Sequence, residues 1–167
     1  MKEKMPEIKQ GINLANYTTM KLGGAAQYFS VLNDESNIPE LMEFAKSKSL
    51  PIFILGGGSN TIVGDAGFAG LVIKNEILGR RISHEDEISV EFELGAGENW
   101  DEFVRYVVTE QNLSGAEAMV MIPGTVGALP IQNVGAYGQE TSDIFVSLRA
   151  YNLETSEFEI LDADDCE

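Results

Sequence analysis

The sequence predicts an α+β fold in which two small α+β subdomains pack together. Three patterns support this: a strand, a helix and a strand follow one another early in the chain, an alternating strand then leads into a second helix, and a hairpin comes last. Strand, helix and strand in succession are typical of a unit with a parallel strand pair. With 167 residues the chain can form one large domain or two small ones, and we expect a division into residues 1–75 and 76–167.

The first subdomain is expected to be a small α/β unit. Residues 17–32, YTTMKLGGAAQYFSVL, read as two short extended pieces separated by Gly23 and Gly24. A helix should follow, because apolar residues recur on one helical face, with caps available just before it: Ile38, Leu41, Met42 and Ala45, capped by Asn33, Asp34 or Ser36. Residues 51–55 (PIFIL) form a continuous apolar strand, and residues 71–74 (LVIK) form another.

The second subdomain is expected to hold strands around one helix. Residues 88–94 (ISVEFEL) alternate between apolar and polar side chains, which predicts a half-buried strand. Asn99 and Glu102 form a plausible capping pair for a helix with a large buried face: Trp100, Phe103, Val104, Val107 and Val108. Two apolar runs around ETSE, residues 144–153 and 158–161, predict a hairpin.

Composition and charge exclude several functions. Lys and Arg number 11 against 27 Asp and Glu, a net charge of −16, which argues against nucleic-acid and anionic-membrane partners. An anionic ligand should therefore be held by backbone N–H groups rather than by basic side chains. One Cys (Cys166) and one His (His84, expected in a solvated loop) cannot supply a zinc site, so no metal is expected. Neither a signal peptide nor a membrane-spanning run is visible, which predicts a cytoplasmic protein.

Two glycine-rich segments follow predicted strands. GAGENW (residues 95–100) lacks the last glycine of a dinucleotide fingerprint, since Trp100 stands there, and a tight turn between strand and helix is the better interpretation. GGGSN, Gly56 to Asn60, fails the same test at Thr61 and also lacks the P-loop ending. Its glycines can nevertheless turn successive N–H groups toward one point, as a pyrophosphate requires. Standing alone, this segment is more typical of a simple turn.

A third glycine-rich segment, residues 122–138 (IPGTVGALPIQNVGAYG), carries no charged side chain. Surface loops usually carry charged or polar residues, so this one is built for close approach by another group. Gln132 and Asn133 can both donate and accept, as recognition of a heterocycle's N–C=O edge requires. The composition also allows a buried crossover that packs on itself.

The chain resembles the UDP-N-acetylmuramate dehydrogenase (MurB, or UDP-N-acetylenolpyruvoylglucosamine reductase) family in four segments: TTMKLGGAAQYF, PIFILGGGSN, LGAGENWDEFVRYVV and IPGTVGALPIQNVGAYGQE. The resemblance runs from about Asn16 to the end of the chain. It implies a PCMH-type FAD-binding fold in which FAD lies, noncovalently bound, between two α+β subdomains. In the family a separate substrate-binding domain follows, and we expect that domain to be absent here.

The resemblance also implies an activity. Members of the family use NADPH to reduce FAD, and the flavin then passes hydride to UDP-N-acetylglucosamine enolpyruvate, a nucleotide sugar, giving UDP-N-acetylmuramate for peptidoglycan. The family's catalytic Arg, Ser and Glu would lie beyond Glu167, so we expect no catalytic residue in this chain and no turnover by it alone. Hydride transfer would then lack its general acid and its electrostatic stabilisation.

Site residues carry over by position within the matching motifs. The resemblance assigns one set to the FAD pyrophosphate and ribityl region: Gly56, Gly57, Gly58, Ser59 and Asn60. It assigns a second set to the isoalloxazine ring and its linker: Ile122, Pro123, Gly124, Ala128, Leu129, Ile131 and Gly135. Tyr137 is implied to reach the phosphates of the substrate. Leu129 stands where the family commonly has a small residue, so the loop is expected to sit slightly farther from the cofactor.

The sequence is also compatible with two other functions. One is a noncovalent flavin-binding module without catalysis, which the absent catalytic groups leave possible. The other is a related PCMH-type oxidase that holds FAD covalently, although Ser59 and Asn60 stand where such an enzyme needs a His or Cys.

Overall fold

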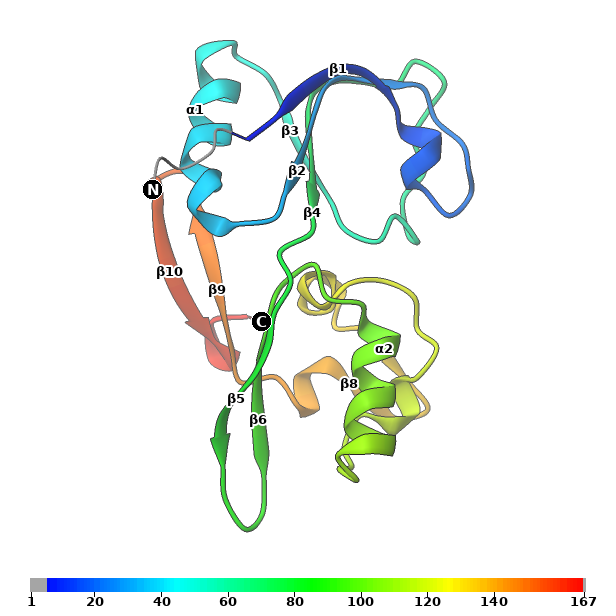
Figure 1. Cartoon of the computed structure of the whole chain (residues 1–167), viewed down its shortest axis with the longest axis vertical. Coiled ribbons are helices and arrows are strands. Elements are labelled where there is room, and N and C mark those ends of the chain that lie inside the picture. The colour runs from blue at the N-terminus through cyan, green and yellow to red at the C-terminus, as the bar shows by residue number, and fades with distance from the viewer. Residues whose placement is uncertain (1–5, 167) are drawn as a thin grey trace.

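The computed structural model describes residues 6–166. Its upper part in Figure 1 is a four-stranded sheet with one helix. Its lower part contains the second helix, and three two-stranded pairs make up the remaining strands. The sheet has the order β1-β2-β4-β3, from four strands: β1 (Ile8–Asn13), β2 (Ala25–Leu32), β3 (Ile52–Leu55) and β4 (Phe68–Asn75). The α+β fold expected from the sequence is confirmed.

Strand β4 lies between the two strands that the sequence pattern placed in succession. It pairs in parallel with β2 on one side and with β3 on the other, so Val72 faces both Phe29 and Phe53 in register. Leu71 and Ile73 point to one face of the sheet and Val72 to the other, and all three are fully buried. A strand buried on both faces reads as a continuous apolar run, which is why LVIK was recognisable.

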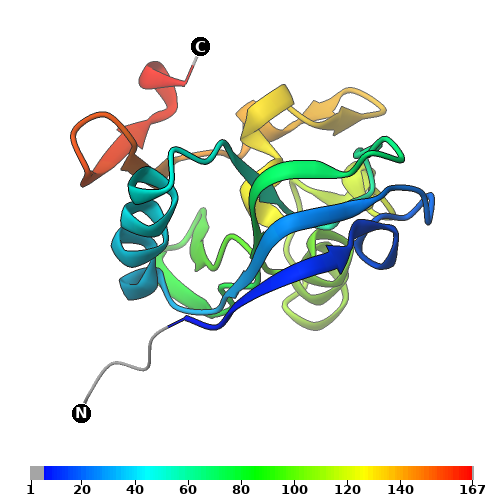
Figure 2. The same cartoon turned by 90° about the horizontal axis from the view of Figure 1, so that it is seen from above.

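Helix α1 (Ile38–Ser47) covers one face of the sheet (Figure 2). Leu41 and Ala45 pack against Leu32, Leu71 and Ile73, as the helical spacing predicted. The cap differs in detail. Asp34 accepts a hydrogen bond from the Ser36 N–H and so begins a short 3₁₀ turn, η2 (Glu35–Asn37), which leads into the helix.

One prediction about the start of the chain is wrong, and one strand there was not predicted. The expected extended piece at residues 17–22 is not a strand, because Tyr17 ends a 3₁₀ turn (η1, Leu14–Tyr17, with Leu14 buried under the sheet) and residues 18–20 form a further turn. Residues 8–13, for which no element was predicted, form strand β1, which pairs antiparallel with β2. As an edge strand it buries only part of one face, so its sequence IKQGIN lacks a strong apolar pattern.

The lower part is built around helix α2 (Trp100–Arg105), which continues as a π-helical turn, η3 (Tyr106–Glu110). One half of the predicted capping pair is present, since Asn99 Oδ1 accepts the Glu102 N–H at 3.0 Å. A hairpin of β5 (Arg80–Glu85) and β6 (Val90–Leu94) extends beside the helix. Of the alternating residues, Phe92 and Leu94 pack on the α2 core, whereas Ile88 lies exposed in the hairpin turn. His84 lies exposed in β5, not in a loop as expected.

The remaining elements lie between residue 117 and the end of the described chain. They are four 3₁₀ turns, a small strand pair and a further turn at the end: η4 (Glu117–Met119), η5 (Val126–Ala128), η6 (Pro130–Gln132), η7 (Thr141–Asp143), β7 (Gly135–Ala136), β8 (Gln139–Glu140) and η8 (Ala163–Asp165). The predicted hairpin forms from β9 (Ser147–Asn152) and β10 (Glu157–Asp162). Figures 1 and 2 both place it beside α1, where Arg149 pairs with Glu35.

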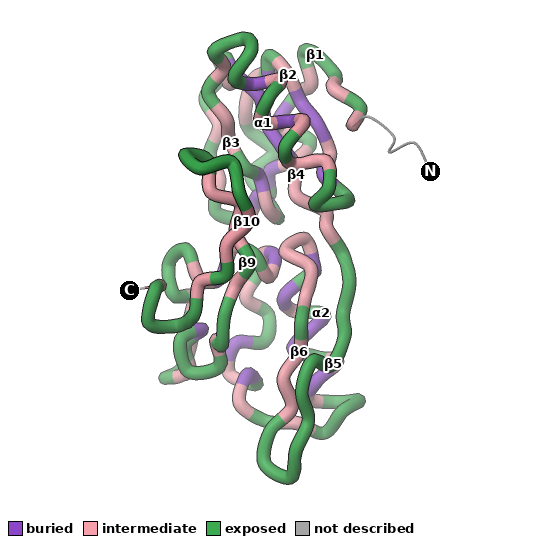
Figure 3. The backbone as a smooth tube through the Cα atoms, turned by 90° about the vertical axis from the view of Figure 1, so that its left-hand side faces the viewer, coloured by how far each residue is buried: buried purple, intermediate pink, exposed green. Residues whose placement is uncertain are grey.

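Buried residues gather in separate places along the molecule (Figure 3). Two clusters lie on the two faces of the sheet, and the third surrounds α2, with Trp100, Val104 and Met119 at its centre. The division at residue 75 stays a prediction. No helix within residues 6–166 is long and apolar enough to cross a membrane.

Candidate cofactor-binding site

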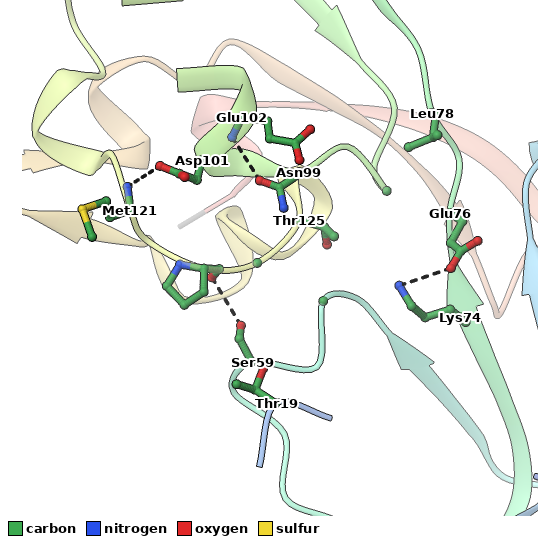
Figure 4. A pocket seen from close by; sticks show the side chains of 14 residues that line it. Thr19, Ser59, Lys74, Glu76, Leu78, Asn99, Asp101, Glu102, Met121 and Thr125 are labelled. Atoms are coloured by element: carbon green, nitrogen blue, oxygen red, sulfur yellow. Dashed lines mark hydrogen bonds and ion pairs between the residues drawn. The ribbon is translucent and has the colours of Figure 1, made fainter. Parts of the chain in front are cut away.

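A cleft of about 590 Å³ lies where the sheet meets the α2 part of the molecule (Figure 4). Its volume is within the range of ~300–1,000 Å³ that is usual for small-molecule sites. Its walls come from five segments: Thr19 after η1, the turn after β3, the end of β4 with the chain beyond it, the start of α2 with the turn before it, and residues 121–125. Residues far apart in sequence therefore share one concave surface.

The GGGSN turn is shaped by its last glycine. Gly58 has a φ of 70°, and a Cβ there would lie 2.0 Å from the Tyr17 carbonyl oxygen, so no other residue fits. The Gly58 carbonyl accepts the Thr19 N–H at 3.0 Å, which fixes the turn against the segment after η1. Gly57, just before it, is exposed toward the cleft.

The loop at residues 121–127 is fastened to the segment that precedes α2. The Trp100 N–H donates to the Gly124 carbonyl at 3.2 Å, and the Val126 N–H donates to the Glu98 carbonyl at 2.9 Å. A Cβ at Gly127 would lie 2.7 Å from the Ala96 side chain, so the two backbones are in close contact. The glycines of GAGENW serve a different contact: a Cβ on Gly95 would lie 2.3 Å from the Ile77 carbonyl oxygen, and one on Gly97 would lie 2.6 Å from the Glu76 Cα. GAGENW forms the turn that was predicted between β6 and α2, and it packs on the segment after β4 as well as on the later loop.

The two predicted loops meet across the cleft. A Cβ on Gly57 would lie 3.1 Å from the Gly124 Cα, tighter than ordinary contact. The Ser59 hydroxyl donates to the Pro123 carbonyl at 3.3 Å. Asn60 Nδ2 donates to Gln132 Oε1, also at 3.3 Å, so the amide expected to read a heterocycle is engaged with the other loop.

Unused backbone donors make the site suitable for an anion. Among residues 6–166, no hydrogen bond between backbone groups uses the N–H of Gly57, Gly58 or Ser59, nor that of Gly124 or Thr125. Successive N–H groups in such turns form concave sites for phosphate groups. The residues present therefore fit the pyrophosphate of a dinucleotide cofactor.

Side-chain charge in the cleft is mainly negative. Glu76, Asp101 and Glu102 line it, and the ammonium of Lys74 is shared with Glu76 at 3.8 Å. The Arg105 side chain and the Met121 N–H both bond to Asp101, and they hold the pKa of its carboxyl below the ordinary value. The Asp101 carboxyl therefore stays ionised at neutral pH, and an anionic ligand in this acidic cleft must rely on the backbone donors.

The first set of predicted residues lies at the cleft. Gly57 and Ser59 line it directly, Gly58 is buried beneath them, and Asn60 reaches the opposite loop. Gly56 packs on the other loop, since a Cβ there would lie 2.8 Å from Thr125 Oγ1.

The second set is divided. Pro123 and Gly124 line the cleft, whereas the side chain of Leu129 is buried in the α2 core, and Ile122 packs against the same core. Ala128 lies in η5, 3.9 Å from a Cβ placed on Gly56.

Three predicted residues lie away from the cleft walls. Ile131 and Tyr137 are exposed, with Tyr137 in the turn between β7 and β8 at 98% exposure, and Gly135 lies in β7 beside β8. Their roles toward a ligand stay predictions.

Sequence reasoning missed several cleft residues: Thr19, Lys74, Glu76, Leu78, Gly97, Asp101, Met121 and Thr125. Thr19 and Gly97 lie inside motifs that were singled out for other reasons, so their position beside the glycine turns could have been inferred. Met121 carries no such signal, because its role depends on a backbone conformation rather than on its side chain.

The fold and the cleft define an FAD-binding domain. Residues 26–159 match the family described as FAD binding domain, and the chain belongs to this family. The chain is 42% identical to a UDP-N-acetylenolpyruvoylglucosamine reductase of Thermobifida fusca over 158 residues, which are 94% of the chain and 44% of that protein. It is 41% identical to the reductase of the same name from Burkholderia multivorans, over 92% of the chain and 43% of that protein.

A solved structure shows the same fold. The crystal structure of UDP-N-acetylenolpyruvylglucosamine reductase (MurB) from Thermus caldophilus superposes with a TM-score of 0.77 at 23% identity, covering 96% of this chain and 54% of that one. The resemblance inferred from the motifs is thereby confirmed. The chain spans less than half the length of the curated relatives above.

Proposed function

We propose that this chain is the FAD-binding part of an NADPH-dependent reductase that converts UDP-N-acetylglucosamine enolpyruvate to UDP-N-acetylmuramate in peptidoglycan synthesis. One observation carries the proposal: the two glycine loops face each other across a cleft, and both present N–H groups that no other backbone group within residues 6–166 uses. The sequence similarity to reductases of this name supports the assignment of the reaction.

The chain's own residues bind and orient the cofactor in this proposal. The N–H groups of Gly57, Gly58 and Ser59 bind the pyrophosphate, while Pro123 and Gly124 present backbone to the flavin. Leu129 contributes through its backbone in this proposal, because its side chain is buried in the α2 core. Bound FAD would supply the hydride-carrying chemistry between NADPH and the enolpyruvyl group.

The remaining predicted ring contacts are Ile122, Ala128, Ile131 and Gly135, and we keep them in the proposal. The exposed Tyr137 is free to reach a ligand phosphate from outside the cleft, as the resemblance implies. The same proposal includes the enolpyruvyl substrate, NADPH as the hydride donor and a cytoplasmic location. It also includes a substrate-binding domain that packs on this chain. The relatives' additional length supplies room for such a domain.

Cofactor binding by the purified chain tests the first half of the proposal. We expect a yellow protein that releases unmodified FAD on denaturation, and apoprotein that quenches added FAD fluorescence to a 1:1 end point. Colourless protein that never takes up FAD would refute it. Covalently retained flavin would instead favour an oxidase, but His84 and Cys166 are not among the residues that line the cleft.

A catalytically silent flavin module is the second candidate function. The charged side chains at the cleft are mainly carboxylates, and the backbone donors beside them suit binding of a cofactor without chemistry on a second ligand. We expect no oxidation of NADPH coupled to the enolpyruvyl substrate by this chain alone. Steady-state turnover would show that the catalytic groups are present after all, whereas recovery of turnover when the relatives' remaining segment is added would favour the reductase over the module.

A further inference from the structure

Met121, at the edge of the cleft, has an unfavourable backbone conformation. Its φ is 65°, in the left-handed region that residues with a Cβ rarely occupy. Its side chain is 74% exposed, so burial of the side chain does not hold it there. Another interaction must stabilise this conformation.

The Asp101 carboxylate supplies that interaction. Asp101 Oδ1 accepts the Met121 N–H at 2.6 Å, and its other oxygen, Oδ2, accepts Arg105 Nε at 2.9 Å (Figure 4 shows the first bond). Asp101 lies in the first turn of α2, whose buried face is fixed in the core. A rigid element therefore holds the strained residue.

The backbone conformation of Met121 sets the position of the next three residues, 122–124, which belong to the proposed cofactor site. Pro123 has a restricted φ, so the chain direction at Met121 decides where Pro123 and Gly124 lie. The Pro123 carbonyl accepts the Ser59 hydroxyl, and the Gly124 carbonyl accepts the Trp100 N–H. Residues 121–124 are thus fastened to the start of α2 at both ends, and in this position Gly124 faces Gly57.

We propose that Asp101 is a positioning residue, which holds Met121 in its left-handed conformation and thereby fixes residues 122–124 for FAD. This inference rests on the proposed function. Asp101 itself contacts the loop backbone, and its effect on the cofactor passes through that loop.

The test compares the FAD dissociation constants of the wild type with three variants. Asp101→Ala should weaken binding about tenfold, the effect of losing one charge-assisted hydrogen bond. Asp101→Asn should stay within about threefold, because its Oδ1 can still accept the Met121 N–H. Arg105→Gln removes the ion pair and leaves the Met121 bond, so it should match the wild type within about twofold. Equal weakening by Asp101→Ala and Arg105→Gln would overturn the proposal.

Met121→Gly provides an independent check, because glycine adopts the left-handed conformation without a steric penalty. Added to Met121→Gly, the Asp101→Ala substitution should weaken FAD binding less than about threefold relative to Met121→Gly alone. If it still weakens binding about tenfold in that background, Asp101 does not act by holding the strained backbone of Met121.

Amide hydrogen exchange in the apoprotein separates this inference from the proposed function. Asp101→Ala should speed exchange of the Met121 N–H and of the Trp100 and Val126 N–H groups that bond across this loop, while Arg105→Gln should not. Unchanged exchange in Asp101→Ala would overturn the inference even if FAD binds. Failure of the wild type to bind FAD would instead refute the proposed function, and the exchange pattern would still decide whether Asp101 fixes the loop.

Discussion

Arg80 Nε lies 2.6 Å from Glu98 Oε2, and this ion pair joins strand β5 to the segment that precedes α2. Glu98 is only 7% exposed, and its other oxygen accepts the Gly79 N–H at 2.8 Å. Burial raises the pKa of the Glu98 carboxyl, but the hydrogen bonds from Gly79 and Arg80 and the charge of Arg80 outweigh it and leave the pKa below its ordinary value. Glu98 is therefore ionised at neutral pH, beside two cleft residues, Gly97 and Asn99.

Glu98→Gln should destabilise the protein at pH 7 by about 1.5–3 kcal/mol, the range for a hydrogen bond to a charged group. Because the folded-state pKa is lowered, this stabilisation is complete above the ordinary Glu pKa of 4.5 and is lost as pH falls through the folded-state pKa. Urea unfolding of both proteins between pH 7 and pH 3 should show the two curves converging in acid. Glu102→Gln, on an exposed residue 3.9 Å from Arg80, is the control and should change stability by less than about 0.5 kcal/mol.

Gly57→Val should abolish FAD binding with little loss of apoprotein stability. The new side chain would press on the Gly124 backbone and occupy the cleft where the two loops meet. FAD titration measures the loss, and circular dichroism reports whether the fold remains. Gly64→Val is the matched control, since a Cβ there meets nothing within 4 Å. Unchanged affinity in Gly57→Val would mean that the pyrophosphate lies elsewhere.

Trp100→Phe should cost about 1–3 kcal/mol of stability. Trp100 is 2% exposed, and its Nε1 donates to the carbonyl of the fully buried Met119 at 3.1 Å. Phenylalanine would leave that carbonyl without this donor and would fill less of the core. Denaturant unfolding followed by circular dichroism measures the difference. Tyr137→Phe, at 98% exposure, should lie within about 0.5 kcal/mol of the wild type, and equal effects of both variants would contradict this packing.

Strong periodicity made much of the fold predictable. Helix α1 follows from the spacing of its apolar residues, and β4 follows from a continuous apolar run that is buried on both faces. The edge strands β1 and β5 escaped notice because each exposes most of its side chains. The insertion of β4 between β2 and β3 was not predictable either, since pairing between strands depends on contacts far apart in sequence.

The candidate site was also predictable only where the sequence itself carries the signal. The two glycine loops could be predicted, because missing side chains and missing charge are visible in the sequence. The bond between Asp101 and Met121 could not, since it depends on a φ of 65° at a residue whose type does not favour that conformation. The side chain of Leu129 is buried in the α2 core, a placement that its sequence position did not indicate, and its expected effect on the distance between loop and cofactor stays a prediction.

Arg149→Ala should loosen the terminal hairpin without unfolding the rest of the protein. An isolated two-stranded hairpin is marginally stable, and here Arg149 pairs with Glu35 and stacks 4.2 Å from the centre of the Phe158 ring. Faster amide exchange is expected at residues 147–162, with a change in global stability below about 1 kcal/mol. Arg81→Ala removes a similar exposed pair with Glu93 on the other hairpin and should leave exchange at residues 147–162 unchanged.

Salt should tighten FAD binding rather than weaken it. The protein carries a net charge of −16, and the cleft is lined by Glu76, Asp101 and Glu102, so the FAD pyrophosphate approaches against a repulsive field. Raising ionic strength from about 0.01 to 0.15 M shortens the Debye length from about 30 to 8 Å, which screens this repulsion while the short N–H bonds are little affected. A decrease of about two- to fivefold in the dissociation constant is expected, and a site built from basic side chains would show the opposite trend. Riboflavin, which lacks the pyrophosphate, is the matched ligand: its affinity should stay constant over the same range. Weaker FAD binding at high salt would therefore contradict recognition by backbone donors and would point to a cationic side chain at the pyrophosphate.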